Sequence, residues 1–359
     1  MIVTGGGTGG HLFPGIAVAE GMLARVEGAE VLFVSTDRAM DGQALANRPF
    51  ARTAISCQPL KGRGWAGKIA GLLGLPASLW QAMRLIRGFN PRLVMGVGGY
   101  VTGPVVLAAK ILGIATCIHE QNSVPGMANR MLGKIVDRIY ISIPGSERFF
   151  PAGKTVLTGN PVRRELVAAA EAAPSRWEGG PTLLVLGGSQ GAHRVNTLMV
   201  EALRKGPLPA GLTVVHQTGK ADEEMVRRAY GEAGISARVS AFITDMAEAY
   251  SQADLVISRS GATTLAELTV MAKPAIFVPY PYAADDHQTT NARFLVEGGG
   301  AKMLVERELD AGRLREEILG LLAAPERLRQ MGDRMRCFAR PDATGAIVEE
   351  NARLLGLAA

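Results

Sequence analysis

Short apolar runs alternate along the chain with longer segments in which apolar residues recur at helical spacing. Most of these runs end in glycine or in a small group of polar residues, as strands do where they meet a loop. The predicted strands are residues 1–4, 31–35, 93–97, 115–118 and 138–142 in the first half of the chain, and residues 182–186, 213–217, 238–242, 254–258, 275–279 and 302–305 in the second. Because a helical segment separates most strands, the pattern predicts parallel sheets with right-handed crossovers.

The alternation pauses near residues 158–163 and then begins again. Each half opens with a strand and a glycine-rich loop that ends in histidine, residues 5–11 in the first half and residues 187–193 in the second. A chain of 359 residues is also long for one hydrophobic core. We therefore predict an α/β protein of two Rossmann-like domains that face one another across a cleft. Ligands should bind at the carboxyl ends of both sets of strands.

Residues 254–267 combine a predicted strand, a glycine turn and the start of a helix. The helix should begin near Ala262, with Ser260 as its cap and with Gly261 allowing a ligand to approach the backbone. The free N–H groups of such a helix start attract anions. Glu267, further along this helix, could accept both hydroxyls of a ribose. An ordinary strand–helix unit with a solvated Glu267 explains the same pattern, so this stretch alone does not decide between the two.

The basic residues are unevenly placed along a chain whose net charge is +6. No Asp or Glu lies between Asp41 and Glu120, whereas Lys and Arg occur there repeatedly, at Arg48, Arg52, Lys61, Arg63, Lys68, Arg84, Arg87, Arg92 and Lys110. This stretch favours an anionic partner, whether phosphate, nucleic acid or acidic lipid. The 3 widely spaced cysteines are typical of reduced thiols in a cytoplasm, and no His/Cys/carboxylate grouping has metal-ligand spacing. We expect no bilayer-spanning segment, because proline or paired glycines interrupt the longest uncharged runs.

Residues 69–89 are strongly apolar, include Trp80, and lie among Lys68, Arg84 and Arg87. One interpretation is a helix whose apolar stripe faces the core. The other is a surface patch that enters a membrane, with Trp80 at the interface and the basic residues on anionic headgroups. The sequence leaves both open.

Two motifs of the first half carry candidate chemistry. The loop Gly5-x-Gly7-x-x-Gly10 formally matches the dinucleotide fingerprint of a dehydrogenase, for which only Asp37 could supply the ribose-binding acid. His11 closes that loop and either faces the cleft or is a buried structural histidine. Polar side chains fill residues 119–122, directly after a predicted strand, where burial is costly unless the groups are satisfied or used in function.

Taken in chain order, the motifs resemble those of the bacterial N-acetylglucosaminyltransferases of peptidoglycan synthesis, which convert lipid I to lipid II at the cytoplasmic face of the membrane. The matching motifs are residues 6–11 (Gly-Gly-Thr-Gly-Gly-His), 98–100 (Gly-Gly-Tyr) with 103–104 (Gly-Pro), 119–122 (His-Glu-Gln-Asn), 159–163 (Gly-Asn-Pro-Val-Arg), 187–192 (Gly-Gly-Ser-Gln-Gly-Ala), 259–262 (Arg-Ser-Gly-Ala) with Glu267, and 287–288 (His-Gln) with 291–292 (Asn-Ala). The resemblance runs essentially from end to end, and a series of motifs in order is more specific than any one glycine loop.

The resemblance implies a GT-B type glycosyltransferase whose last helix returns to the first domain. The domains would then be residues 1–160 plus 341–359, which bind the acceptor and the membrane, and residues 161–340, which bind the nucleotide sugar. The implied partners are UDP-N-acetylglucosamine (UDP-GlcNAc), lipid I and an anionic membrane surface, with no nucleic acid, no metal and no cofactor. The implied location is peripheral, at the cytoplasmic face of the membrane.

The resemblance also implies roles for individual residues. Donor contacts carry over to Thr8, Gly9 and Gly10 near phosphate, Asn122, Arg163, Ser189 at the diphosphate, the backbone of Ile243 at uracil, Ala262, Thr263, Thr264, Leu265, Ala266 and Glu267 at phosphate and ribose, and Gln288 at the sugar. The implied reaction inverts the sugar in one displacement, so the acceptor hydroxyl needs a general base. Our first candidate for this base is His11 and the second is Glu120.

Other classes of protein remain alternatives at this stage. A UDP-GlcNAc epimerase would share the architecture and the donor site but has no need of a lipid-facing patch. A nucleotide-sugar sensor would need neither His11 nor Glu120. An NAD-dependent dehydrogenase leaves the donor-like site of the second half unexplained.

Overall fold

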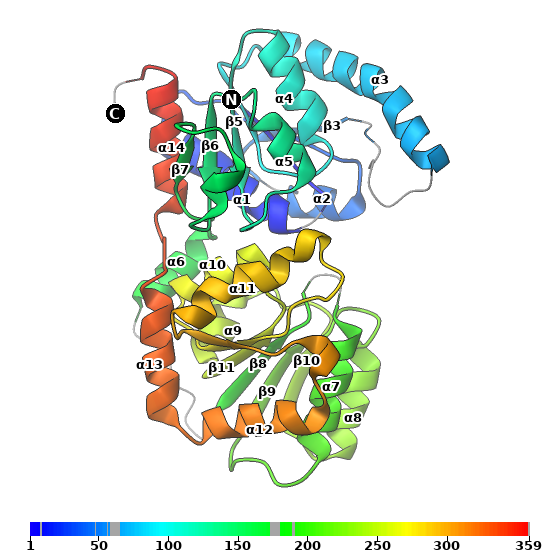
Figure 1. The fold of residues 1–359 in the computed structure, drawn as a ribbon, viewed down its shortest axis with the longest axis vertical. Coiled ribbons are helices and arrows are strands. Elements are labelled where there is room, and N and C mark those ends of the chain that lie inside the picture. The colour runs from blue at the N-terminus through cyan, green and yellow to red at the C-terminus, as the bar shows by residue number, and fades with distance from the viewer. Residues whose placement is uncertain are drawn as a thin grey trace. The chain divides into compact units, whose positions relative to one another are not determined.

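A computed structural model of the chain describes residues 1–357 except 8, 47, 56, 58–64, 173–179 and 189–190, and at residues 39, 40, 43 and 65–74 it describes the backbone only. The chain divides into two compact units, Met1–Arg163 with Pro341–Ala359, and Arg164–Arg340. Each unit is a parallel sheet covered by helices (Figure 1). The predicted α/β class with two Rossmann-like domains is therefore confirmed.

The sheet of the first unit has 7 described strands, all parallel, in the order β3-β2-β1-β4-β5-β6-β7. In sheet order they are β3 (Ala51–Ala54), β2 (Leu32–Ser35), β1 (Ile2–Thr4), β4 (Leu93–Gly96), β5 (Ala115–Glu120), β6 (Arg138–Ile141) and β7 (Thr155–Leu157). The direction of the strand order reverses between β1 and β4, which is where ligands bind in sheets of this type.

Helices cover both faces of the first sheet. They are α1 (Gly9–Arg25), α2 (Ala39–Ala44), α3 (Trp65–Phe89), α4 (Thr102–Ile111), α5 (Met127–Leu132), the short 3₁₀ helix η1 (Ser146–Phe149) and α14 (Ala343–Leu354). Successive strand residues point to opposite faces, so Ile2 packs in the cluster with α3 and α4, whereas Val3 packs in the cluster with α1 and α14. The last helix thus completes the core of the first unit.

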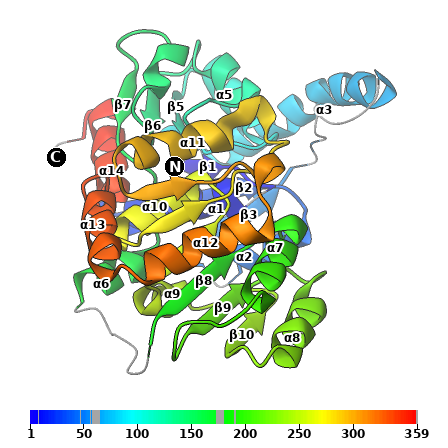
Figure 2. The same ribbon diagram turned by 60° about the horizontal axis from the view of Figure 1, so that its bottom comes forward.

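The second unit repeats this plan with 6 described strands in the order β10-β9-β8-β11-β12-β13, again all parallel. In sheet order the strands are β10 (Ala237–Ser240), β9 (Thr213–Gln217), β8 (Thr182–Leu186), β11 (Leu255–Ser258), β12 (Ala275–Phe277) and β13 (Ala301–Met303). Figure 2 shows β8, β9 and β10 side by side. The strand order reverses between β8 and β11, the counterpart of the β1–β4 reversal in the first unit.

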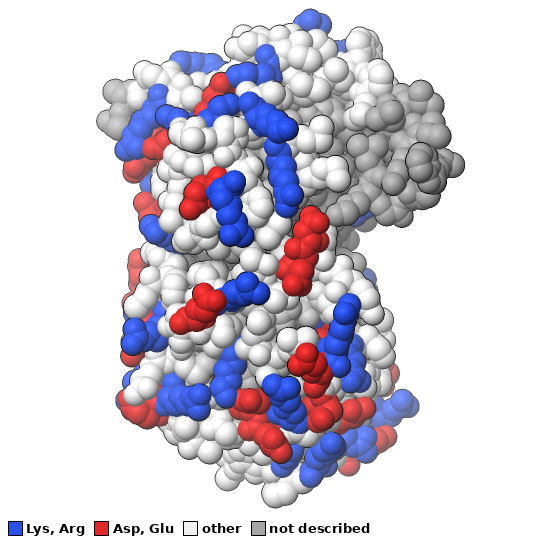
Figure 3. Space-filling view, in the orientation of Figure 1, with Lys and Arg blue, Asp and Glu red and all other residues white. Residues whose placement is uncertain are grey.

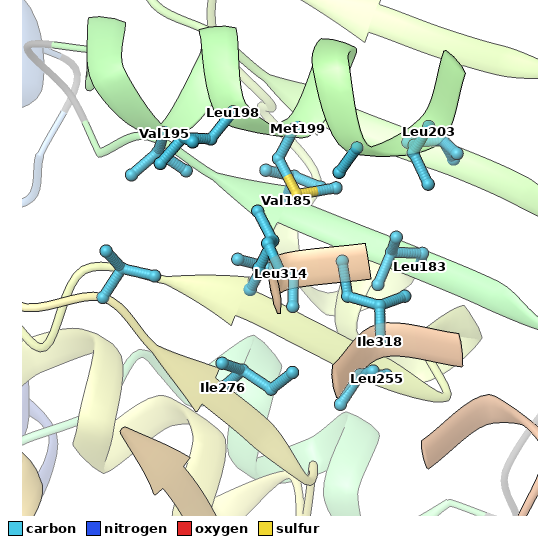
Figure 4. Close-up of a cluster of buried hydrophobic side chains, with 14 of the residues drawn as sticks. Leu183, Val185, Val195, Leu198, Met199, Leu203, Leu255, Ile276, Leu314 and Ile318 are labelled. Atoms are coloured by element: carbon cyan, nitrogen blue, oxygen red, sulfur yellow. The ribbon is translucent and has the colours of Figure 1, made fainter. Parts of the chain in front are cut away.

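The helices of the second unit enclose its core. They are α6 (Arg164–Glu171), α7 (His193–Arg204), α8 (Glu223–Glu232), α9 (Met246–Gln252), α10 (Ala262–Val270), η2 (Ala284–Asp286), α11 (His287–Glu297), η3 (Glu306–Glu308), α12 (Ala311–Leu322) and α13 (Pro325–Arg336). Apolar side chains of α7 and α12 pack on those of β8 and β11 (Figure 4). The resulting burial of apolar surface fixes the position of each strand end relative to the helix that follows it.

Two local predictions differ from the structure. The glycine-rich loop is predicted to run over residues 5–11, but α1 already begins at Gly9, and Pro14 lies inside this helix. Proline removes only one backbone hydrogen bond, to the carbonyl of Gly10, and this loss is tolerated near the start of a helix. The edge strands β3 and β7 were not predicted. The residues of β3 are mostly exposed and those of β7 are only partly buried, so neither strand forms a buried apolar run.

Candidate active site

In the first unit, two glycine loops meet where β1 and β4 separate. A Cβ atom on Gly99, whose φ is +86°, would lie 2.4 Å from the carbonyl oxygen of Gly6. A Cβ atom on Gly5 would lie 2.3 Å from a methyl group of Val97. Larger residues would push the loops apart, so glycine is required for the two backbones to approach this closely.

Asp41 holds the first of these loops in place. Its buried carboxylate accepts hydrogen bonds from the N–H of Gly7 at 3.2 and 3.1 Å and from the hydroxyl of Thr36 at 2.5 Å. Arg38 donates to the carbonyl of Gly7 at 3.2 Å, and its guanidinium lies 5.5 Å from the centre of the Tyr100 ring. Sequence reasoning missed Asp41, because nothing local distinguishes a carboxylate that reaches back to a loop 34 positions earlier.

His11 lies in the first turn of α1, directly beside the second glycine loop. A Cβ atom on Gly98 would lie 2.7 Å from Cδ2 of the imidazole, so the ring fills the space that this glycine leaves. The residue is half-buried, which gives the ring a packed side and an accessible side. Gly9 and Gly10 are the first residues of the same helix, and Thr8 lies outside the described residues.

His119 is a buried structural histidine at the end of β5. Its Nε2 lies 3.1 Å from the carbonyl oxygen of Gly159, and its Nδ1 lies 3.1 Å from the amide nitrogen of Gln121, which also donates to the carbonyl of Val97. Because the Gly159 carbonyl can only accept and the Gln121 amide donates to Nδ1, the ring proton lies on Nε2. Burial lowers the pKa of His119 to about 4, although the hydrogen bond to Gly159 acts in the opposite direction. The ring is therefore neutral and ties β5 to its neighbours.

Glu120 is also buried, and both of its oxygens accept hydrogen bonds. One accepts from the backbone N–H and the side-chain amide of Asn122 at 2.9 and 3.2 Å. The other accepts from the N–H of Gly126 at 3.3 Å and from the amide of Asn129 at 2.8 Å. Burial raises the pKa of Glu120, and these donors oppose the shift. This geometry suits a carboxylate that holds Asn122 in position, and it leaves His11 as the better placed candidate base.

Arg163 lies at the end of the first unit, where its guanidinium is 5.5 Å from the centre of the Phe13 ring on α1. This contact places a cation next to the helix that carries Gly9, Gly10 and His11. The sequence-predicted residues of the first unit thus form two groups, one around the start of α1 and one around the end of β5.

In the second unit, α10 begins at Ala262, as predicted, but Ser260 does not cap it. The N-cap residue is Gly261, and no described side chain caps the helix. The buried Ser260 hydroxyl instead donates to the carbonyl of Gln288 at 2.8 Å. Ser260 stands one position too early to reach the N–H groups of the first turn. Its bond instead connects the start of α10 to the start of α11.

Glu267 is 7% exposed, so the interpretation of a solvated carboxylate is wrong. One of its oxygens accepts a hydrogen bond from the buried Tyr250 hydroxyl at 3.0 Å. Leu265 points into the core, so that it could contact a ligand only through its backbone, whereas Thr263, Thr264 and Ala266 are partly accessible. The helix start and the carboxylate thus lie on one short helix that follows β11, at the reversal of the strand order.

Gln288 and Ile243 each use one hydrogen-bonding group in a bond within the protein. The side-chain oxygen of Gln288 accepts from the N–H of Tyr280 at 2.9 Å, so the NH₂ group is the part of this side chain that could donate to a ligand. The N–H of Ile243 donates to the side chain of Gln217 at 3.0 Å, so its carbonyl is the backbone group left for a base. Ser189 lies outside the described residues.

Acid should destabilise the second unit through His216. Burial lowers the pKa of this histidine to about 3, below its value in the unfolded chain, so the unfolded state binds the proton more readily. The stability that this difference contributes is present above the unfolded pKa of about 6.5 and is lost as the pH falls below it. We expect the free energy of unfolding to fall by about 2 kcal/mol from this group alone between about pH 6.5 and pH 5.

Urea denaturation at the two pH values measures this change. His287→Gln, at a partly exposed histidine, is the matched control and should leave the pH dependence unaltered. His216→Asn should reduce it. An equal pH dependence in His216→Asn and in the wild type would contradict the assignment.

Comparison with known proteins places this geometry in a class. The glycosyltransferase family 28 N-terminal domain matches residues 1–141, and the glycosyltransferase family 28 C-terminal domain matches residues 182–345. The chain is therefore a glycosyltransferase built from two Rossmann-like domains. A relative from Desulfotalea psychrophila is 51% identical over 350 residues, a match that covers 97% of this chain and 95% of the relative. It is named UDP-N-acetylglucosamine–N-acetylmuramyl-(pentapeptide) pyrophosphoryl-undecaprenol N-acetylglucosamine transferase, and this chain belongs to that family.

Solved structures agree with this assignment. The crystal structure of Acinetobacter baumannii MurG matches with a TM-score of 0.77 and 33% identity, covering 98% of this chain and 99% of that one. A UDP-GlcNAc 2-epimerase from Neisseria meningitidis, bound to UDP-GlcNAc, matches with a TM-score of 0.71 but only 15% identity, covering 98% of this chain and 99% of that one. The second likeness shows a shared fold alone. The epimerase and dehydrogenase alternatives are not favoured.

Proposed function

We propose that this enzyme transfers N-acetylglucosamine from UDP-GlcNAc to the 4-hydroxyl of the N-acetylmuramyl sugar of lipid I and so makes lipid II for peptidoglycan. The observation that carries the proposal is the buried carboxylate of Glu267 on α10, the helix that begins where the strand order of the second sheet reverses. Lipid II supplies the cell wall, so the reaction serves cell shape and division.

The second unit binds the donor in this proposal. A ribose offers two hydroxyl donors, and Glu267 provides carboxylate oxygens to accept them. The N–H groups at the start of α10 meet the diphosphate, and the helix dipole there favours negative charge. Negative charge grows on the diphosphate as the sugar departs, so these fixed donors act most strongly in the transition state. Uracil meets the carbonyl of Ile243, and the NH₂ group of Gln288 donates to a hydroxyl of the sugar.

The first unit activates the acceptor. His11 takes the proton of the acceptor hydroxyl, while Glu120 keeps Asn122 in place for contact with the donor. Gly9, Gly10 and Arg163 supply backbone N–H groups and a cation for phosphate oxygens. A single displacement inverts the anomeric centre, so no covalent intermediate is required.

We further propose that the first unit binds an anionic membrane surface as a peripheral protein at the cytoplasmic face. The described part of α3 has one face in the core and another face on which an apolar side chain lies exposed beside basic residues. Ala82 and Ile86 face the core, whereas Trp80 is 61% exposed and lies beside Arg84. The side chain of Lys68, together with residues Lys61 and Arg63, lies outside what the structure describes.

Two neighbouring helices also carry exposed apolar residues, whereas the sequence analysis confined the apolar surface to residues 69–89. Exposed apolar side chains occur on α4, which packs on α3, and on α5, which packs on α4. These side chains are Leu107, Ile111, Met127 and Met131, and together with Trp80 we call them the apolar patch. Lys and Arg side chains border uncharged areas near α4 and α5 in Figure 3. None of the described helices has the length and apolar character that a membrane crossing requires.

Replacing Arg84 and Arg87 by Ser, together with Trp80 by Ser, should reduce binding to anionic vesicles by at least about 30-fold, since each basic residue near such a surface contributes about 1 kcal/mol. Vesicle sedimentation measures the bound fraction. Arg327→Ser with Arg336→Ser, two exposed arginines of α13, is the control that removes the same charge from the second unit. Equal losses in the two variants would mean that net charge alone drives binding and would contradict the patch.

Labelled UDP-GlcNAc incubated with lipid I tests the reaction itself. Label should move into the lipid phase, and it should stay in the aqueous phase when lipid I is omitted. Conversion of the nucleotide sugar to its epimer without lipid labelling would support the epimerase alternative and contradict the proposal.

A further inference from the structure

The glycine loop of the second unit ends in His193, a residue to which the proposed reaction gives no role. His193 is the first residue of α7, and its side chain is 77% exposed. Its Nδ1 lies 2.9 Å from a carboxylate oxygen of Asp222. Because an ionised carboxylate can only accept, Nδ1 carries a proton and Nε2 is the nitrogen turned outward.

The Asp222 side chain bonds to residues of α7 and does not cap α8, the helix that it precedes. It is the N-cap residue of α8, yet its side chain makes no cap hydrogen bond. Its second oxygen instead accepts from the amide of Asn196 at 2.7 Å. Burial works against the charge of Asp222, but hydrogen bonds from His193 and Asn196 outweigh it and lower the pKa of the carboxyl. An ordinary cap would have stabilised α8 by about 1 kcal/mol.

A chain of buried groups holds this pair in place. The side-chain oxygen of Asn196 lies 3.1 Å from Nε2 of His216, and Nδ1 of His216 lies 3.0 Å from the Tyr230 hydroxyl. Asn196 also donates to the carbonyl of Thr218 at 2.9 Å. Tyr230, His216 and Asn196 are each at most 1% exposed. These buried hydrogen bonds fix the orientation of Asp222, and Asp222 in turn fixes the orientation of His193.

The network also supports the glycine loop after β8. The N–H of Gly187 donates to the carbonyl of Gln217 at 2.9 Å. A Cβ atom on Gly187 would lie 3.5 Å from the side-chain oxygen of Asn196, and one on Gly191 would lie 2.8 Å from the carbonyl of Thr218. His193 follows this loop directly, and a side chain on the first turn of a helix leans toward the N-terminal end, where the loop lies.

We propose that His193, oriented by Asp222, is a phosphate-binding residue of the donor site that holds the diphosphate of UDP-GlcNAc through Nε2 when the ring is protonated. The inference rests on the proposed function and adds a residue to its donor site. A neutral ring would present a lone pair to the phosphate and repel it, whereas the imidazolium donates a charge-assisted hydrogen bond. Donor affinity should accordingly fall as the pH rises.

Other charged groups on the packed helices do not account for such a dependence. Helices α8 and α12 pack against α7. On α8, Glu223 pairs with Arg227, and on α12, Arg315 donates to the carbonyl of Ala202, near the far end of α7. Arg194, next to His193, donates to the carbonyl of Leu309. Among the described residues, Asp222 is the charged group that bonds to the ring.

Calorimetric titration of UDP-GlcNAc between about pH 6 and about pH 8 tests the proposal. Each phosphate of this ligand has a single acidic oxygen that stays ionised over this range, so only protein groups titrate. His193→Gln should weaken binding about tenfold at the lower pH and much less at the higher pH. His193→Lys, which keeps a cation, should restore affinity and remove the part of the pH dependence that belongs to His193. Uridine, which lacks phosphate, should bind all three proteins alike.

Equal affinity and equal pH dependence in the wild type and His193→Gln would overturn the proposal, as would a parallel loss of uridine binding. Failure of His193→Lys to restore affinity would also overturn it, since a structural role would explain that result. A wild-type protein that binds UDP-GlcNAc at neither pH would instead overturn the proposed function. The melting temperature of each ligand-free variant shows that the exposed position tolerates the change.

Discussion

Replacing His11 by alanine is expected to lower turnover by about 10²–10⁴-fold, with little change in the affinity for UDP-GlcNAc. The reason is that the acceptor hydroxyl must lose its proton as the bond to the sugar forms, while donor binding belongs to the second unit. The half-buried ring lies in the first turn of α1 and rests on Gly98. Initial rates with lipid I, together with calorimetric titration of the donor, measure the two quantities separately.

Glu120→Gln is the matched comparison for this experiment. An amide retains an oxygen acceptor for Asn129 or Asn122 but loses the other, so we expect a smaller loss of turnover accompanied by weaker donor binding. A near-wild-type rate for His11→Ala, with a large loss in Glu120→Gln at unchanged donor affinity, would move the role of the base to Glu120.

Replacing Glu267 by alanine should raise the dissociation constant of UDP by about 10²-fold, because hydrogen bonds to a charged group contribute about 1.5–3 kcal/mol each. One oxygen of the buried carboxylate accepts from the Tyr250 hydroxyl, and in the proposed function the carboxylate also accepts from the ribose hydroxyls. Calorimetric titration of UDP measures the loss. Because the alanine variant also leaves the Tyr250 hydroxyl without its partner, its melting temperature must be compared with that of Tyr250→Phe.

A deoxyribose ligand separates the ribose contact from a general disturbance of the helix. The wild-type protein should bind 2′-deoxy-UDP more weakly than UDP, and Glu267→Ala should bind the two nearly equally. An undiminished preference for UDP in the variant would contradict the ribose assignment, whatever the change in absolute affinity.

The strands could be predicted from the sequence because each buried strand of a parallel sheet is a short apolar run with a clear end. The boundaries of β8 and β9 agree with the prediction to the residue. The burial of Glu267 could not be predicted, because its place on the polar side of the helix is equally compatible with a solvated carboxylate. Edge strands such as β3 carry no such signal, since their side chains are mostly exposed.

Residues that act through tertiary contacts could not be found in the same way. Asp41 bonds to Gly7 and Asp222 bonds to His193 across gaps of 34 and 29 positions, and each carboxylate looks ordinary within its own segment. The cap predicted at Ser260 was wrong for a related reason, since local spacing favoured a cap while the hydroxyl found a partner on another helix. Periodicity reports which face of an element is buried, but it does not report which distant group that face meets.

The most direct test of this account is a crystal structure of the protein with UDP bound. We predict that the ribose hydroxyls lie within hydrogen-bond distance of the Glu267 carboxylate, with the diphosphate at the N–H groups that open α10. Uridine diphosphate bound elsewhere in the molecule, with no nucleotide at Glu267, would contradict it.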